Sequence, residues 1–253
     1  YSLRSFNSFA IDVPFEKIGN PSLLFSISAI AISIFGATIF GKTDNNEITL
    51  LSLFLCSLAA FLVFSSKPGK IIVLYSTALS VLLISSLVSP QVSCLDIQVE
   101  YFFADSVISG FSIDIFSYGH YSTVLSTQSI VPLISLWSGI SLNYVFQVIY
   151  PIIFSFCAVL LFYTYDRLFG PDIAFFSVLF TIFSVSFNTS MLDVARQGFS
   201  EIFLFSAILL MSHSDDVRAY RNRVFIVPLL ISMTLAHYGI NYVMYPVLWL
   251  AYF

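Results

Sequence analysis

The chain has 253 residues, of which 58% are hydrophobic and only 9% are charged, with a net charge of -4. A soluble domain carries about 25% charged residues, so this composition excludes a soluble fold with a charged shell. Three scattered cysteines form neither a disulfide framework nor a zinc site, and no nucleotide-loop, metalloprotease or nucleic-acid-binding motif is present.

Apolar stretches recur along the chain at lengths that suit transmembrane helices. In chain order, the predicted spans cover residues 23–40, 48–64, 71–88, 142–163, 173–187, 202–211 and 224–240, and an eighth may end at position 253. The sixth is short, and we expect it to begin earlier. Pro151 lies inside the fourth, where a single proline is tolerated. The sequence therefore predicts an all-α polytopic transmembrane helix bundle of about seven or eight spans.

The spacing of these stretches divides the chain into three parts. Residues 1–90 hold an N-terminal segment and three spans, residues 91–141 form a long extracytoplasmic loop, and residues 142–253 hold the remaining spans. Apolar runs at Val99–Phe103 and Ile130–Trp137 predict short juxtamembrane helices in the loop. Because the chain starts at Tyr1 and stops inside an apolar run, we expect it to be part of a longer protein, truncated at its C-terminus.

The distribution of basic residues predicts the orientation in the cell membrane. Lysine and arginine are enriched in cytoplasmic loops. With the N-terminus in the cytoplasm, only Lys42 and Arg196 lie outside, and the other eight bases lie inside: Arg4, Lys17, Lys67, Lys70, Arg167, Arg218, Arg221 and Arg223. The connections 41–47, 89–141 and 188–201 are then extracytoplasmic.

Acidic residues without nearby bases mark the long outer loop. Asp96 and Glu100 are four residues apart, so they share one face of a helix. Like charges at this spacing favour a shared cation or a raised pKa on one carboxyl group, and either would suit a general base or a site for Mg²⁺ or Mn²⁺. A solvated acidic loop is the alternative interpretation.

Three further polar residues are candidates for substrate binding. Arg196 lies where the sixth span enters the membrane, and its guanidinium suits a phosphate group; the alternative is an interfacial arginine, or one paired with Asp193 or Glu201. His237 lies near the outer end of the seventh span. It is interpreted either as a residue that binds the substrate or as a group that makes an interhelical hydrogen bond. His120, in the long loop, either joins the acidic site or is solvated.

Several runs of residues, in this order and spacing, resemble an archaeal family of polytopic membrane proteins of unassigned function that is distantly similar to GT-C glycosyltransferases. The runs are Val124–Ser126, Ile130–Pro132, Gly139–Ile140, Val145–Ser155, Ala195–Phe203 and Ala236–Gly239. The resemblance covers roughly residues 90–245, and relative to GT-C enzymes the first two spans would be an added hairpin.

The resemblance implies transfer of a sugar from a polyprenyl-phosphate donor at the extracytoplasmic face. Asp96 and Glu100 would match the catalytic acids of the outer loop. Arg196 and His237, with Tyr238 and His120, would contact the donor and its phosphate. A membrane lipid is the expected partner, with possible additional membrane subunits and no nucleic acid.

Two other classes of protein remain open. A transporter or lipid flippase usually carries polar groups at mid-membrane, and the first six spans have almost none at their centres. A non-catalytic subunit of a larger complex would fit the aromatic content of 17%. The glycosyltransferase hypothesis predicts one cavity lined by Asp96, Glu100, Arg196 and His237.

Overall fold

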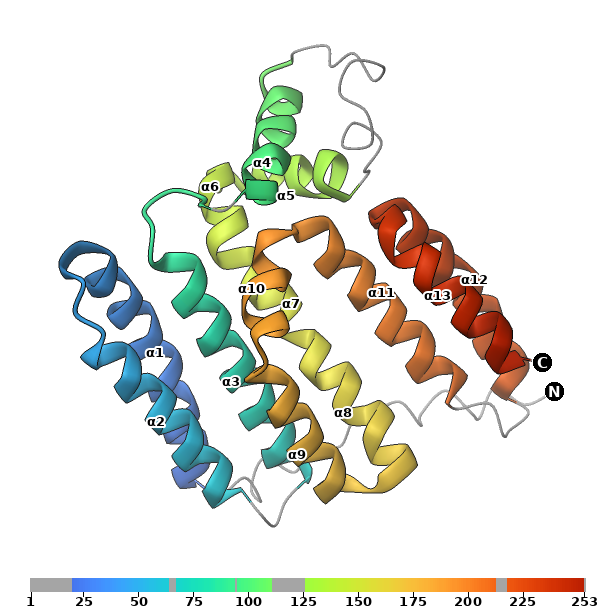
Figure 1. Ribbon diagram of the computed structural model, residues 1–253, viewed down its shortest axis with the longest axis horizontal. Helices are drawn as coiled ribbons and strands as arrows, with labels where there is room; N and C mark the ends of the chain where they lie inside the picture. Colours follow the sequence, from blue (N-terminus) through green and yellow to red (C-terminus); the bar gives the residue numbers. More distant parts are fainter. Residues whose placement is uncertain (1–19, 64–66, 94, 111–125, 213–217, 253) are drawn as a thin grey trace.

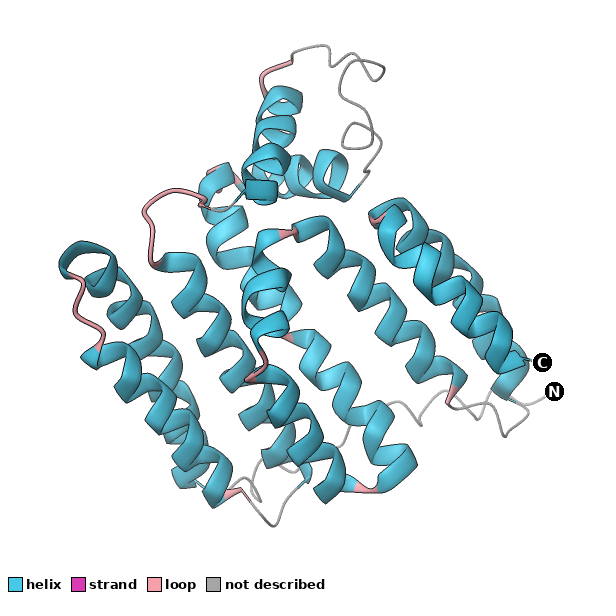
Figure 2. Ribbon diagram, viewed as in Figure 1, coloured by secondary structure: helices cyan, strands magenta, loops and turns pink. Residues whose placement is uncertain are grey.

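A computed structural model describes residues 20–63, 67–93, 95–110, 126–212 and 218–252, and every regular element in these residues is helical (Figures 1 and 2). The first helices are α1 (Asn20–Thr43), α2 (Glu47–Leu62), α3 (Lys67–Leu87) and α4 (Leu95–Ile108). The middle elements are η4 (Ser126–Ile130), α5 (Val131–Ser138), α6 (Leu142–Tyr144), η5 (Val145–Ile149), α7 (Tyr150–Phe154) and α8 (Phe156–Phe169). The last are α9 (Pro171–Ile182), α10 (Val185–Asp193), α11 (Ala195–Met211), α12 (Arg218–Ala236) and α13 (Tyr238–Tyr252).

The first two helices form a tight hairpin because small residues let their backbones approach. A Cβ on Gly36 would lie 2.9 Å from the backbone nitrogen of Thr49. The hydroxyls of Ser33 and Ser52 are hydrogen-bonded at 2.5 Å, and Ser52 also donates to the carbonyl of Ala29. Small residues and buried hydroxyl bonds are typical of helix contacts in membranes, where burial from water contributes little.

Pro151 interrupts the hydrogen bonding of the long segment from α6 to α8 without ending it. A proline has no N–H, so the carbonyl four residues earlier, that of Gln147, loses its helical partner. The hydroxyl of Ser86 on α3 donates to this carbonyl at 2.8 Å. The π-helical turn η5 ends at Ile149, two residues before Pro151. The expectation that the proline is tolerated is met because α3 supplies the missing donor.

Fewer helices could cross a membrane than the seven or eight predicted. Among the described residues, three are long and apolar enough: Pro21–Thr43, Lys67–Leu87 and the combined segment Leu142–Phe169. The pair α9 and α10 would be a fourth, as one span bent by 59°. The helical character is thus confirmed, and three to four of the described helices are compatible with a multi-pass membrane protein, whereas the higher count is not met.

The remaining predicted spans are helices that are too short or too polar to qualify. Helix α2 has 16 residues, which at 1.5 Å per residue is about 24 Å, below the roughly 30 Å of a bilayer core. Helix α11 begins at Ala195, earlier than residue 202 as expected, but has only 17 residues. The seventh prediction divides at His237 into α12 and α13, so the apolar part of α12 is Val224–Ala236.

The helices run alternately up and down, which sorts the described bases between two ends of the bundle (Figure 1). At one end, Lys67 pairs with Asp166 at 2.5 Å and Lys70 pairs with Asp172, which ties the start of α3 to α8 and α9. Arg196 lies at the opposite end, at the start of α11. The predicted partition of these bases between two membrane faces fits this arrangement, and the orientation in the cell stays a prediction.

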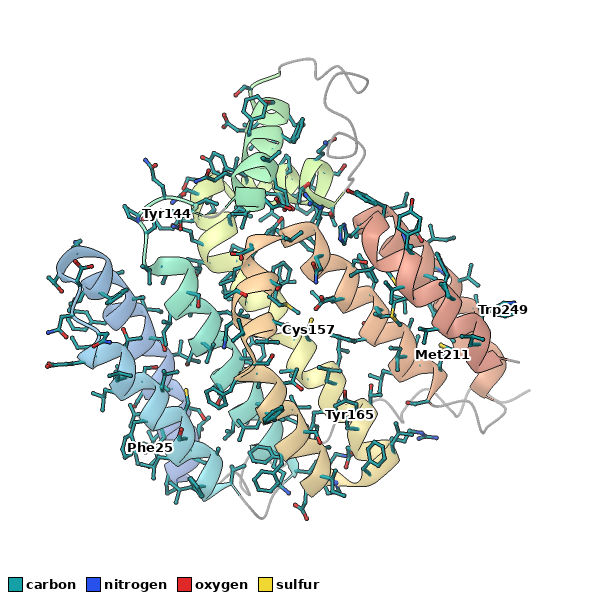
Figure 3. The ribbon with its side chains drawn as sticks, in the orientation of Figure 1. Phe25, Tyr144, Cys157, Tyr165, Met211 and Trp249 are labelled. Atoms are coloured by element: carbon teal, nitrogen blue, oxygen red, sulfur yellow. The ribbon has the colours of Figure 1, made fainter. Side chains whose placement is uncertain are left out.

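Helices α4, α5 and α6 cover the end of the bundle at which α10 ends and α11 begins (Figure 1). Helices α4 and α5 occupy the two apolar runs of the long loop in which short helices were expected. Figure 3 shows one buried and one exposed side chain among those it labels. Cys157 lies inside the bundle, and Trp249 points away from α13. These residues are 0% and 62% exposed, respectively.

Candidate functional site: an acidic pair held by a buried arginine

Two carboxylates on α4 meet one guanidinium on α11. Asp96 stands in the first turn of α4, and Glu100 follows one turn later on the same face. Arg196 donates from Nη2 to Asp96 Oδ2 at 2.9 Å and from Nη1 to Glu100 Oε1 at 3.0 Å. The predicted repulsion between the two acids is therefore relieved by a cation from a helix almost one hundred residues away in the sequence.

Glu100 also caps the N-terminus of α11. The first N–H groups of a helix have no partner within the helix, and the preceding residue Val194 makes no side-chain cap. Glu100 Oε2 accepts from the backbone N–H of Arg196 at 3.2 Å. A negative charge at this end also interacts favourably with the helix dipole. One carboxylate thus fixes both the side chain and the backbone of Arg196.

The two acids differ in their exposure and therefore in their chemistry. The Glu100 side chain is 2% exposed, whereas that of Asp96 is 39% exposed. Burial raises the pKa of Glu100 to about 8, although Arg196 and its backbone N–H act in the opposite direction. Glu100 is therefore suited to a positioning role inside the protein, and Asp96 is the carboxylate that a molecule from outside can reach.

His237 lies next to this cluster, in the break between α12 and α13. Burial lowers the pKa of His237, Arg196 lowers it further, and Asp96 opposes both, so the imidazole is close enough to sense the cluster. Its Nδ1 atom is buried and has no hydrogen-bond partner among the described residues. A Cβ on Gly239 would lie 2.9 Å from His237 Nε2, so the glycine leaves room for the ring.

A layer of aromatic rings supports α11 just below the cluster. The ring of Phe199 packs edge-to-face on Tyr150 at 5.1 Å and on Phe154 at 5.6 Å. A Cβ on Gly198 would lie 2.6 Å from the ring of Phe154, so only glycine permits this contact. The start of α11, which carries Arg196, is therefore held in place by close packing as well as by ion pairs.

A cavity of about 420 Å³ between α11 and α13 opens beside His237. Its polar residues are Gln197, Glu201 and His237, and apolar side chains continue it along both helices: Leu204, Phe205, Ile240, Val243 and Met244. A polar mouth that leads into an apolar groove suits an amphipathic molecule with a polar head and a hydrocarbon chain.

The predicted site residues are brought together only in part. Asp96, Glu100 and Arg196 are in direct contact, and His237 is adjacent to them. The prediction of one cavity lined by all four is not met, because Arg196 points away from the cavity toward α4 and only His237 lines it. Tyr238 is 38% exposed and packs its ring on His237 at 5.3 Å. His120 lies outside the described residues.

The donor set does not call for the predicted divalent cation. Among the described residues, no three His, Cys, Asp or Glu side chains gather as a metal site would require. The guanidinium of Arg196 bridges Asp96 and Glu100, and it supplies the positive charge there that Mg²⁺ or Mn²⁺ would otherwise provide.

Sequence reasoning missed the role of two polar residues of α11. Glu201 was considered as a partner of Arg196, but its Oε1 atom instead accepts from Gln197 Nε2 at 2.8 Å. Both residues line the cavity that His237 borders. Their spacing of four residues was the available signal, because it places both on one face of α11.

Comparisons with known proteins found no match: no family model, curated protein or solved structure is similar to the chain. The resemblance to GT-C glycosyltransferases is thus neither supported nor opposed by these comparisons.

Proposed function

We propose that the protein is a membrane glycosyltransferase of GT-C type that transfers a sugar from a polyprenyl-phosphate donor at the extracytoplasmic face. The observation that carries this proposal is a partly exposed carboxylate, Asp96, held by a buried arginine beside an amphipathic cavity. Because the Asp96 side chain is 39% exposed, an acceptor hydroxyl can reach it.

In this proposal Asp96 is the general base. It takes the proton of an acceptor hydroxyl while that oxygen forms a bond to the anomeric carbon of the donor sugar. The bond from the anomeric carbon to the phosphate oxygen breaks, and the polyprenyl phosphate leaves with the electron pair. The polyprenyl chain lies along the apolar part of the cavity between α11 and α13.

Arg196 and Glu100 act as positioning residues. The guanidinium fixes the orientation of Asp96, and Glu100 fixes the guanidinium. Neutral His237, at the mouth of the cavity, donates an N–H group to the leaving phosphate, a contribution of the kind made by preorganised donors. Both Nη atoms of Arg196 are bonded to the two acids, so Arg196 positions Asp96 and does not contact the phosphate.

The test is turnover in reconstituted liposomes. Purified chain is mixed with polyprenyl-phosphate mannose, glucose or N-acetylglucosamine and with a hydroxyl-bearing acceptor, either an oligosaccharide or a glycolipid. Release of polyprenyl phosphate and glycosylation of the acceptor are followed by thin-layer chromatography. We expect turnover with at least one donor, and a loss of about 100-fold or more in Asp96→Asn, since a positioned base contributes about 10² to 10⁴.

Asp105→Asn is the matched control, because Asp105 is an exposed carboxylate on the same helix outside the cluster. It should keep full turnover. Equal melting temperatures of Asp96→Asn and the wild type show that the lost activity is not lost folding. The proposal is refuted by full turnover in Asp96→Asn, or by the absence of turnover with every donor.

A transporter is the second candidate, and the bent pair α9 and α10 is the observation that favours it. Broken helices with polar linings are typical of transport sites. A cavity of about 240 Å³ lies at this break and is lined by hydroxyl groups, including those of Ser184 and Ser190, together with Glu201. Solute or lipid flux in the same liposomes, without sugar transfer, would favour this function.

A further inference from the structure

A second polar cavity, of about 490 Å³, lies at the same end of the bundle, between α4 and the start of the segment that begins with α6. Its lining residues are Gln91, Val92, Gln98, Tyr101 and Asn143. The volume falls in the range of about 300 to 1,000 Å³ that is usual for sites of small ligands. Neither the acid–arginine cluster nor the proposed transfer reaction uses any of these residues.

One wall of this cavity is held rigidly by amide side chains. Asn143 Oδ1 accepts from the backbone N–H of Val92 at 3.1 Å, and Asn143 Nδ2 donates to the carbonyl of Pro90 at 3.1 Å and to Gln147 Oε1 at 2.8 Å. Gln147 Nε2 donates in turn to the carbonyl of Ser89 at 2.8 Å. The connection that follows α3 is therefore fixed to α6 and η5, and the cavity is preformed.

The cavity also offers polar groups, on α4 and on the connection that follows α3, that the protein does not use fully. Gln98 makes one long contact, from Nε2 to the carbonyl of Val92 at 3.4 Å, and its Oε1 atom has no hydrogen-bond partner among the described residues. The side-chain amide of Gln91 and the phenol of Tyr101 have no hydrogen bond to described residues. Amides and a phenol together can both donate and accept.

The chemistry of the lining selects against charge. No Asp, Glu, Lys, Arg or His is among the described residues that line the cavity, and the negative charge of Asp105 acts on Tyr101, so an anionic ligand would find no counter-charge there. Tyr101 packs on Phe146 with ring centroids 5.7 Å apart, which fixes its ring as a flat apolar surface. Neutral amides beside a fixed aromatic ring suit a ligand that has many hydroxyl groups and an apolar C–H face.

This cavity is separate from the acid–arginine cluster. At about 100° per residue, Gln98 and Tyr101 project about 200° and 140° around α4 from Asp96. The thickness of α4 therefore stands between the two sites. A ligand in this cavity does not contact Asp96, and substitutions in one site can be read independently of the other.

We infer that the cavity lined by Gln91, Gln98, Tyr101 and Asn143 binds an uncharged, hydroxyl-rich glycan at the same membrane face as the acid–arginine cluster. The glycan is either a free oligosaccharide or the head group of a neutral glycolipid. This inference goes beyond the proposed transfer reaction and does not depend on it, because it concerns binding alone.

The experiment is saturation-transfer NMR on the protein in lipid nanodiscs. The probes are mannose, N-acetylglucosamine and maltotriose, and glucuronic acid is the anionic comparator. We expect signal from at least one neutral probe, at least fivefold weaker signal from glucuronic acid, and loss of the neutral signal in Gln98→Ala and in Tyr101→Ala. Val99→Ala, an exposed substitution on the same helix outside the lining, should keep the signal.

Three results would overturn the inference: no signal from any neutral probe, an equal signal from glucuronic acid, or a neutral signal that survives both substitutions. If Tyr101→Ala lowers the melting temperature, Gln91→Ala replaces it, because Gln91 is exposed. Nanodiscs that contain a neutral glycolipid identify the source of the glycan. If the glycolipid competes with the neutral probe, the ligand is lipid-borne, and if it does not compete, the ligand is a free glycan. Both outcomes support a glycan site. Asp96→Asn should keep the neutral signal, so that failure of binding and failure of transfer are distinguishable.

Discussion

Replacement of Arg196 by methionine should destabilise the protein strongly and in a pH-dependent way. Methionine fills a similar volume without charge, so Glu100, which is 2% exposed, would lose its cation while it stays buried. Breaking a buried ion pair by removal of one partner costs about 3–5 kcal/mol. At pH 9 wild-type Glu100 is ionised, but loss of Arg196 raises its pKa further, so Glu100 in the variant takes up a proton instead. Because the wild-type pKa is about 8, this limits the pH-dependent part of the loss to about 1.4 kcal/mol per pH unit, and we expect a total loss of about 2–4 kcal/mol in the free energy of unfolding at pH 9.

At pH 6 the same substitution should cost less, by about 1.4 kcal/mol. The pKa of Glu100 is already raised to about 8 by burial, and Arg196 is one of the groups that lower it, so removal of Arg196 raises it further. Glu100 is then neutral at pH 6 and needs no cation. The remaining loss is that of the hydrogen bonds, about 1–2 kcal/mol, since the pair with Asp96 is partly screened by solvent.

The assay is equilibrium unfolding in bicelles at both pH values, with two further variants. The double variant Arg196→Met with Glu100→Gln should recover part of the loss at pH 9, because the orphaned charge is gone. Lys42→Met, an exposed base at the same end, should change little. A loss below about 1 kcal/mol at pH 9, or an equal loss at both pH values, would refute the reasoning about Glu100.

Three further substitutions test single features of the site. In the wild type, the free energy of unfolding should fall as the pH rises from about 4.5 to about 8, because the unfolded chain releases the proton of Glu100 at a lower pH than the folded chain does. Glu100→Gln should flatten this slope by up to about 1.4 kcal/mol per pH unit. Unfolding at pH 5 to 9 measures both slopes. Gly198→Ala should destabilise the protein by about 1 kcal/mol or more, because the buried ring of Phe154 cannot move aside and the cost of overpacking exceeds the gain in helix propensity. The measurement is the melting temperature, and a higher melting temperature in the variant would contradict the prediction. Gly239→Ala should push the His237 ring out of its half-buried position, so that the pKa of His237 rises toward its ordinary value. NMR titration of labelled histidine would show this rise. An unchanged pKa would count against the packing of His237 on Gly239.

The local features of the site could be predicted from the sequence because they depend on helix periodicity. The spacing of Asp96 and Glu100 predicted that they share one helix face, and they do. The start of the sixth helix before residue 202 was also predictable. Both follow from contacts within about one helical turn, whereas the tolerance of Pro151 depends in addition on Ser86 from α3.

The number of spans could not be predicted as well, because apolar composition does not measure helix length. The run 224–240 is mostly apolar, yet the chain divides there at His237 into α12 and α13. The run 173–187 is likewise bent by 59° within the pair α9 and α10. Breaks of this kind depend on packing against other helices, which hydropathy does not record.

By itself, the sequence determined that the chain is a bundle of apolar helices and that its few charges gather near helix ends, because lipid tolerates neither exposed backbone nor scattered charge. Only the tertiary structure decided which charges meet. Arg196 had candidate partners nearby in Asp193 and Glu201, yet it pairs with Asp96 and Glu100 across about a hundred residues. That choice, and with it the burial of Glu100 and the exposure of Asp96, results from how α4 docks on the start of α11, and no local pattern encodes such a contact.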